Sequence, residues 1–107
     1  MAKFRSATTT NTGTTIKSTG ADVLMVNITN RHNAIIFVKF YNSPVATFQD
    51  TPVLTIQVAA TSQVTLFGNA PSILGTNNGL AVRVVTDNTD SGNTAAATLP
   101  IIEAEYN

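Results

Sequence analysis

The sequence predicts an all-β domain: an antiparallel two-sheet β-sandwich, jelly-roll or Greek-key-like, with an extended N-terminal arm. Three observations lead to this prediction. Of the 107 residues, 43% are apolar and only 11% are charged, which allows a core within one domain. The polar residues are mainly Thr and Asn, 18 and 11 in number, which favour strands and turns respectively. Short alternating apolar runs follow one another without helical crossovers.

Six runs of the sequence predict strands. In the first run, the alternation turns Leu24, Val26 and Ile28 toward the core. The second run, residues 34–41, is apolar on both faces, which is typical of a strand covered on both sides. In the fifth run, Arg83 is expected to point out of the core. The six predicted strands are residues 23–29, 34–41, 53–58, 63–67, 80–86 and 99–106.

Residues 1–20 differ from the rest of the chain and predict an arm, so that the sandwich domain spans residues 21–107. The run SATTTNTGTTIKSTG is low in complexity, and the only large apolar residues of this region besides Met1 are Phe4 and Ile16. Because Thr is a mediocre helix former, the arm is expected to be extended, with an edge strand over residues 14–17 as one option.

Charge is unevenly divided along the chain, although the net charge is zero. Residues 1–39 hold five of the six basic side chains and one acidic side chain. Residues 40–107 hold one basic side chain and five acidic ones. This asymmetry suits subunits that meet through unlike ends, and chance scatter is the alternative. Without a basic stripe, no nucleic-acid partner is predicted. No apolar run approaches the length of a membrane span, so no membrane association is predicted either.

No pattern in the sequence predicts an enzyme, a cofactor or a metal site. The only histidine, His32, lies in a polar turn without a partner acid, and a surface histidine is preferred over catalysis or metal binding. Residues 87–98 place oxygen-bearing side chains at alternate positions from Asp87 to Ser91, as a calcium loop does. Because Thr98 stands where such a loop needs Glu, an ordinary loop is preferred and calcium binding is the alternative.

Several apolar side chains lie outside the predicted strands, in the arm and in two loops, residues 42–52 and 68–79. The second loop is expected to contain a short helical turn over residues 71–74. These side chains either close the ends of the sandwich or anchor a partner, since aromatic residues dominate interface cores. With the basic residues of the arm, the candidate partner-binding residues are Lys3, Phe4, Arg5, Ile16, Lys17, Val45, Phe48, Ile73 and Leu74.

Five short motifs, in order along the chain, resemble those of a family of small structural proteins of tailed-bacteriophage virions. They consist of an IKST lead, a VKFY strand, a TPVLTI strand, a GLAV strand and a TDNTDS loop. The pattern covers about residues 14–106, whereas the Thr-rich segment before it goes beyond the pattern. The motifs lie at residues 16–19, 38–41, 51–56, 79–82 and 86–91.

The resemblance implies a capsid decoration (cement) protein on the outer surface of the virion. Such a protein would bind the major capsid protein and neighbouring copies of itself, as a trimer or dimer, and would need no catalysis. The arm would reach capsid subunits by strand addition, which depends on backbone hydrogen bonds more than on side-chain identity. The alternative is a tail- or fibre-associated adaptor or host-binding module.

Overall fold

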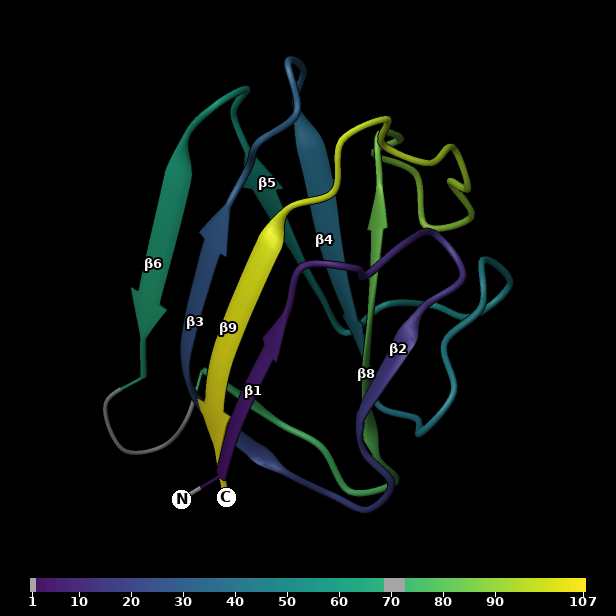
Figure 1. The fold of residues 1–107 in the computed structure, drawn as a ribbon. Helices are drawn as coiled ribbons and strands as arrows, with labels where there is room; N and C mark the ends of the chain where they lie inside the picture. The colour runs from purple at the N-terminus through teal and green to yellow at the C-terminus, as the bar shows by residue number, and fades with distance from the viewer. Residues whose placement is uncertain (1, 69–72) are drawn as a thin grey trace.

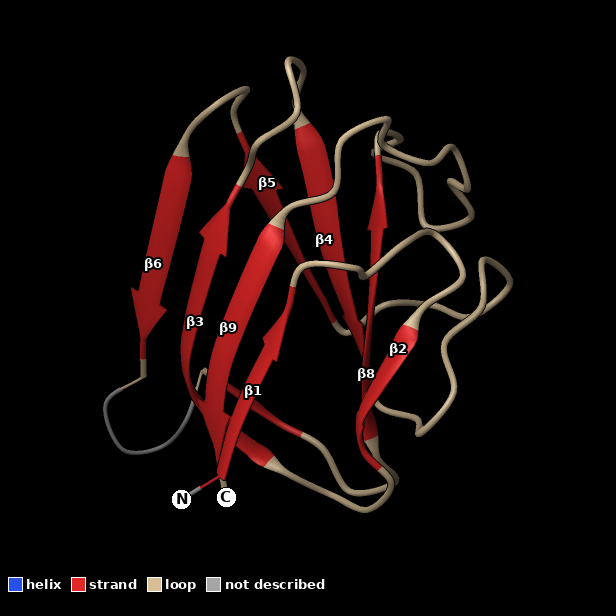
Figure 2. Ribbon diagram, viewed as in Figure 1, coloured by secondary structure: helices blue, strands red, loops and turns tan. Residues whose placement is uncertain are grey.

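The computed structural model describes residues 2–68 and 73–107, and these residues form two antiparallel sheets that pack face to face (Figure 1). The described residues contain strands and loops and no helix (Figure 2). The predicted all-β sandwich is therefore confirmed. The strands are β1 (Ala2–Ser6), β2 (Thr14–Lys17), β3 (Asp22–Thr29), β4 (Ile36–Tyr41), β5 (Leu54–Val58), β6 (Gln63–Phe67), β7 (Leu74–Gly75), β8 (Leu80–Val85) and β9 (Ile101–Tyr106).

The strand order is that of a jelly roll. The strands form nested antiparallel pairs along the chain: β1 pairs with β9, β2 with β8, β3 with β6 and β4 with β5. Pairing of β9 with β3 and of β8 with β4 then completes two sheets. Sheet A has the order β1-β9-β3-β6, with the short β7 also paired to β3, and sheet B has the order β2-β8-β4-β5.

The extended N-terminal arm is not confirmed, because the first strands belong to the sheets. β1 pairs with β9 over its whole length, from Ala2 opposite Tyr106 to Ser6 opposite Ile102. Consequently the two ends of the chain lie side by side (Figure 1). The edge strand foreseen over residues 14–17 is present as β2, and the segment between β1 and β2 crosses from one sheet to the other.

The alternation predicted for β3 is only partly correct. Val26 and Ile28 are buried as expected, but Val23 is buried in place of Leu24, which is half-buried. The pairing of β3 with β9 shifts register between Val23 and Met25. Such a bulge adds one residue to the strand, so the side chains before it switch faces.

The two central strands of sheet B are covered on both faces. All residues of β4 are buried, as the two-sided apolar pattern of residues 34–41 predicted, and all residues of β8 are buried as well. Arg83 points out of the core as expected, yet both Arg83 and its neighbour Lys39 are 0% exposed because loops cover this face. The core between the sheets consists of Ala21, Val23, Val26, Ile28, Ile36, Val38, Phe40, Ile56, Val58, Leu80, Val82, Val84, Ala96, Ile102 and Ala104.

The first half of the helical turn predicted over residues 71–74, residues 71 and 72, lies outside the described residues. Leu74, which is described, belongs to β7 and pairs with Val23. The backbone N–H of Ile73 also donates to the carbonyl of Val23, at 2.9 Å. The described end of this segment is therefore extended and joined to sheet A.

Candidate interaction surface

Two loops and strand β4 meet on Arg83 at the outer face of sheet B. Its Nε donates to the carbonyl of Asn11, in the β1–β2 connection, at 2.7 Å, and its Nη1 donates to the hydroxyl of Tyr41 at 2.9 Å. Its Nη2 donates to the carbonyl of Gly92 at 3.0 Å and to Oδ1 of Asn93 at 2.8 Å, both in the β8–β9 loop. Arg83 is thus the common anchor of loops that are far apart in the sequence.

Lys39 lies opposite Arg83 in the β4–β8 pair, so two buried cations are neighbours. The Lys39 ammonium donates to the carbonyl of Thr89, in the same loop that Arg83 holds. Burial lowers the pKa of Lys39, and the positive charge of Arg83 lowers it further, while Asp90 and Asp87 act in the opposite direction. The loop carbonyls and the two nearby acids make this pair of charges tolerable beneath the loops.

We expect the variant Lys39→Met to alter how stability depends on pH. Because the folded-state pKa lies below the ordinary value of 10.5, the unfolded chain binds more protons between these two pKa values. Lys39 therefore makes the free energy of unfolding rise with pH through that window, and Lys39→Met should lack this contribution. Chemical denaturation at a series of alkaline pH values, compared between the variant and the wild type, measures it. Parallel curves for the two proteins would contradict the prediction.

The two metal-site candidates of the sequence both take part in loop hydrogen bonds. Oδ2 of Asp87 accepts from the hydroxyl of Thr94 at 2.8 Å and from the backbone N–H groups of Asn93 and Thr94, each at 3.2 Å. The Thr94 hydroxyl is the main reason why the pKa of Asp87 is lowered. Nδ1 of His32 accepts from the backbone N–H of Thr98 at 3.4 Å. Within the described ranges, no three His, Cys, Asp or Glu side chains group to hold a metal ion.

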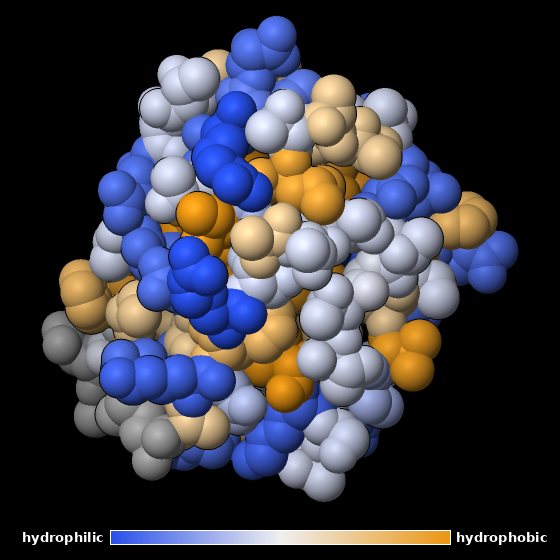
Figure 3. Space-filling model, in the orientation of Figure 1, coloured by the Kyte–Doolittle hydropathy of each residue, from blue (hydrophilic) through white to orange (hydrophobic). Residues whose placement is uncertain are grey.

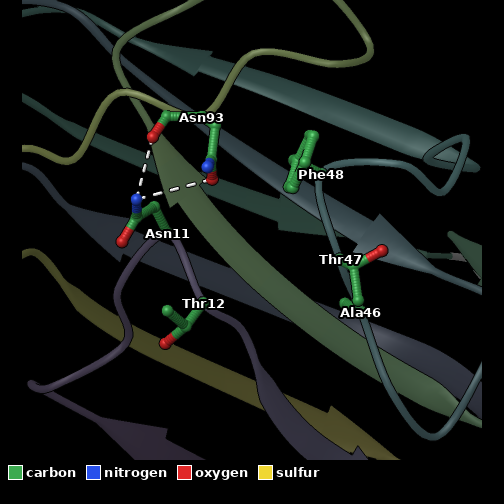
Figure 4. A pocket seen from close by; sticks show the side chains of 6 residues that line it. All are labelled: Asn11, Thr12, Ala46, Thr47, Phe48 and Asn93. Atoms are coloured by element: carbon green, nitrogen blue, oxygen red, sulfur yellow. Dashed lines mark hydrogen bonds between the residues drawn. The ribbon is translucent and has the colours of Figure 1, made fainter.

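A shallow hollow of about 310 Å³ opens between the two loops that Arg83 holds and the β4–β5 loop (Figure 4). On one side Asn11 Nδ2 donates to the carbonyl of Asn93 at 2.8 Å, and on the other side the ring of Phe48 stands on the β4–β5 loop. Phe48 is 43% exposed. The lining residues are Asn11, Thr12, Ala46, Thr47, Phe48 and Asn93. The hollow therefore combines one aromatic wall with amide and hydroxyl groups.

Hydrogen bonds hold the β4–β5 loop on both sides of its apolar residues. On one side Oδ1 of Asn42 accepts from the backbone N–H groups of Asn77 and Asn78, at 3.1 and 2.9 Å. On the other side Oδ2 of Asp50 accepts from the backbone N–H of Thr47 at 2.9 Å and from its hydroxyl at 3.2 Å.

Between these fixed points, two apolar side chains face outward. Val45 is 63% exposed and Phe48 is 43% exposed, whereas Ala46 between them is buried. We refer to Val45 and Phe48 as the loop tip. The bonds of Asn42 join the start of this loop to the segment before β8, and the Thr47–Asp50 bonds close a turn around Phe48, so both sets restrict the loop that presents the loop tip.

The candidate partner-binding residues do not form one site. Only Val45 and Phe48 lie together on one loop, and Lys3 and Arg5 lie on β1, with Lys17 on the other edge strand, β2. The remaining candidates are partly buried and pack against the core. These are Phe4, Ile16, Ile73 and Leu74.

The unlike charges of the two halves of the chain meet within the molecule. On the outer face of sheet A, Lys3 lies opposite Glu105 and Arg5 opposite Glu103, and the Lys3 ammonium is 4.0 Å from Glu105. Figure 3 shows this face, on which hydrophilic side chains are interspersed with smaller apolar areas. The charge asymmetry is therefore at least partly satisfied inside one copy of the chain.

Sequence reasoning missed Lys39 and Arg83 as organising residues. The available signal was a single cation in the middle of an otherwise apolar run, in VKF and in VRV. A charged residue in a strand with two apolar faces must find buried partners, because its burial otherwise costs several kcal/mol. That pattern identifies a covered cation but does not show which loops cover it.

We expect Phe48→Ala to leave the stability of the isolated protein nearly unchanged, with a loss below about 1 kcal/mol. The ring is substantially exposed and does not belong to the core cluster, so its removal leaves no cavity there. Urea denaturation followed by circular dichroism measures the change. A loss of about 3 kcal/mol or more, as for a core Phe, would show that the ring closes the end of the sandwich instead.

Comparison of the chain with protein-family models, with curated proteins and with solved structures found no significant match. In the part of the chain that the structure describes, no helix is long and apolar enough to cross a membrane. What the protein does must therefore be inferred from its fold, its contacts and its sequence pattern.

Proposed function

We propose that this chain is a structural virion protein that decorates and stabilises a bacteriophage capsid. It would bind the major capsid protein and neighbouring copies of itself on the outer capsid surface, and it would act without catalysis. The five motifs that resemble small virion proteins support this role, and so does a jelly-roll fold, which is common among capsid proteins. Since one fold serves many functions, the fold alone is a weak argument.

The loop tip is the observation that carries the proposal. Val45 and Phe48 present apolar surface from a loop that is hydrogen-bonded on both sides and lies against a face anchored by Arg83. An aromatic residue held in place in this way loses little conformational entropy on binding. Such residues supply most of the binding energy of a typical interface. Contact through a free N-terminal arm is no longer part of the proposal, because β1 is paired with β9.

Repetition over a shell would compensate for a small contact in each copy. One loop tip offers few residues, so the affinity of a single copy is expected to be modest. When many copies bind a repetitive surface and also contact one another, the effective affinity rises without new contacts. A surface poor in charge lowers the electrostatic barrier to such association.

Electron microscopy of virions of the phage that encodes the chain tests the location. Density for a jelly roll on the outer shell is expected, and density confined to the tail would overturn the proposal. Binding of the purified protein to capsids lacking it tests the loop tip. Phe48→Ala should weaken binding, whereas Ile35→Ala, which truncates an equally exposed side chain in another turn, should not.

A tail- or fibre-associated adaptor or host-binding module is the second candidate, and the hollow beside Phe48 favours it. An exposed ring face next to the amides of Asn11 and Asn93 is suited to a ligand with apolar and hydroxyl-bearing faces, such as a glycan. Nuclear magnetic resonance shifts of these residues on addition of host-surface glycans would support this candidate. Density at the tail in the same micrographs would favour it over the capsid role.

A further inference from the structure

The two open sides of the sandwich are protected to very different degrees. One side is formed by the edge strands β1 and β2, and the other by the edge strands β6 and β5. An exposed edge strand can pair with another chain, and natural proteins prevent this with charged residues, bulges or Pro. On the first side, β1 carries Lys3 and Arg5, while β2 carries Lys17 and a register shift. That side is blocked against strand addition.

The second side has none of these protections. No charged residue occurs from Thr51 to Val82, a range that contains both β5 and β6. Neither strand contains Pro, and both pair with their inner neighbours without a register shift. No strand in the described chain pairs with the open side of β6, which forms the outer margin of sheet A (Figure 1).

The ladder between β3 and β6 shows which backbone groups of β6 are used within the molecule. The carbonyl of Ser62 accepts from the N–H of Asn30 at 2.8 Å, and the N–H of Gly68 donates to the carbonyl of Leu24 at 2.9 Å. Ser62 and Gly68 therefore both turn toward β3. In an antiparallel ladder, alternate residues direct both backbone groups to the same neighbour.

The residues between them follow from this alternation. Val64 and Leu66 also turn their backbone groups toward β3 and point their half-buried side chains toward the core. Gln63, Thr65 and Phe67 turn their N–H and C=O groups to the open edge. The open edge of β6 is thus a regular row of donors and acceptors without charge beside it.

We infer that β6 pairs antiparallel with β6 of a second copy of this chain. In the register that uses all free groups, Thr65 pairs with Thr65 of the second copy, and Gln63 pairs with its Phe67. Sheet A then continues across both copies. Phe67, which is 77% exposed and is the most exposed large apolar side chain described, is covered in part by the facing strand.

A second copy fits this edge better than another kind of chain. A two-fold axis at Thr65 opposes each strand to itself, so a charged residue at the centre would face its own like charge. The complete absence of charge on β6 is what such self-pairing requires. In this two-fold pairing each copy uses its β6 once, and the continuous sheet A ends at a charged β1 on both sides, so association through this sheet stops at a dimer and does not continue into a fibre. This inference deepens the self-association in the proposed function, but it can be tested without a capsid.

The test is the mass of the purified chain, measured by analytical ultracentrifugation from micromolar to millimolar concentration. The wild type is expected to approach twice 11.3 kDa. Thr65→Lys places two lysines opposite each other and should weaken the dimer at least about tenfold. Mixing Thr65→Lys with Thr65→Glu should restore association, because the two introduced charges are then opposite. Thr98→Lys, on an exposed loop away from β6, is the matched control and should dimerise like the wild type.

Amide hydrogen exchange keeps the test independent of any loss of fold. In the dimer the amides of Thr65 and Phe67 are protected from exchange. In Thr65→Lys the amide of Phe67 should exchange fast, while the amides of Val64 and Leu66, which bond to β3, should still exchange slowly. A wild type that is monomeric at millimolar concentration, or a Thr65→Lys variant that dimerises unchanged, overturns the inference. Failure to bind capsids would instead overturn the proposed function and leave the dimer intact.

Discussion

Replacing Arg83 by Met is expected to lower the free energy of unfolding by about 3 to 5 kcal/mol. Burial of a charge often contributes little net stability, and an apolar substitute of similar size can be neutral when both partners of an ion pair are removed together. Arg83 is different because its acceptors are two backbone carbonyls, a hydroxyl and a side-chain amide oxygen, all of which remain after the substitution. The carbonyls of Asn11 and Gly92 and the hydroxyl of Tyr41 would lose their donor.

Urea denaturation of Arg83→Met against the wild type measures this loss. The control is Arg31→Met, because Arg31 is exposed and its Nε makes one hydrogen bond, 2.9 Å from the carbonyl of Leu99. That variant should lose less than about 1 kcal/mol. If both variants were equally stable, Arg83 would not be the anchor of the loops. Increased amide exchange in residues 87–93 of Arg83→Met would show that the loss lies in the loops.

The fold could be predicted because the sandwich has a strong local signal. In β5, Leu54, Ile56 and Val58 alternate with Thr55 and Gln57, and the structure turns the first set inward. Where this period is broken, the prediction failed. Val23 is buried because of a bulge in the pairing of β3 with β9, and such a bulge depends on a strand at the other end of the sequence.

The role of the first residues was harder to predict for a related reason. A Thr-rich, charge-poor segment suits an edge strand as well as it suits a free arm, since the composition has β-propensity in either case. What decides between them is the partner strand, β9, at the other end of the chain. The sequence contains no local signal for that pairing.

The site could be predicted only in part. Phe48 and Val45 were recognisable as apolar residues in a polar loop, and they are the exposed loop tip. The contacts that position this loop were not recognisable, because they join distant segments: Oδ1 of Asn42 accepts from the backbone N–H of Asn78, 36 residues away. Backbone N–H groups are the donors there, and nearly every residue carries one, so no residue pattern identifies them.

Gly79→Ala is the second substitution with a large expected effect, a loss of about 2 to 3 kcal/mol. Gly79 has a φ of +158°, which side chains rarely adopt, and its Cα lies against the β4–β5 loop. An added Cβ would lie 2.7 Å from the carbonyl carbon of Ser43 and 2.8 Å from Cδ of Pro44. Backbone and a proline ring cannot move aside as a flexible side chain can, so the loop itself has to shift.

The shift links this glycine to the loop tip. Ser43 and Pro44 immediately precede Val45, and the same region is held by the hydrogen bonds of Asn42. Gly79→Ala should therefore reduce stability and also displace the loop tip, whereas Phe48→Ala should affect binding alone. In the control Asn78→Ala, the backbone N–H of residue 78 still donates to Oδ1 of Asn42, so the free energy of unfolding should be nearly unchanged.

Denaturation measures the stability of these variants, and amide chemical shifts of residues 42–48 report the position of the loop. A Gly79→Ala variant with unchanged shifts and unchanged stability would mean that the loop adapts freely. In that case the loop tip would not be preorganised, and the entropic argument for Phe48 as an anchor would no longer hold. Large shifts with an intact fold would instead indicate that the close approach of Gly79 to Pro44 sets the position from which Val45 and Phe48 meet a partner.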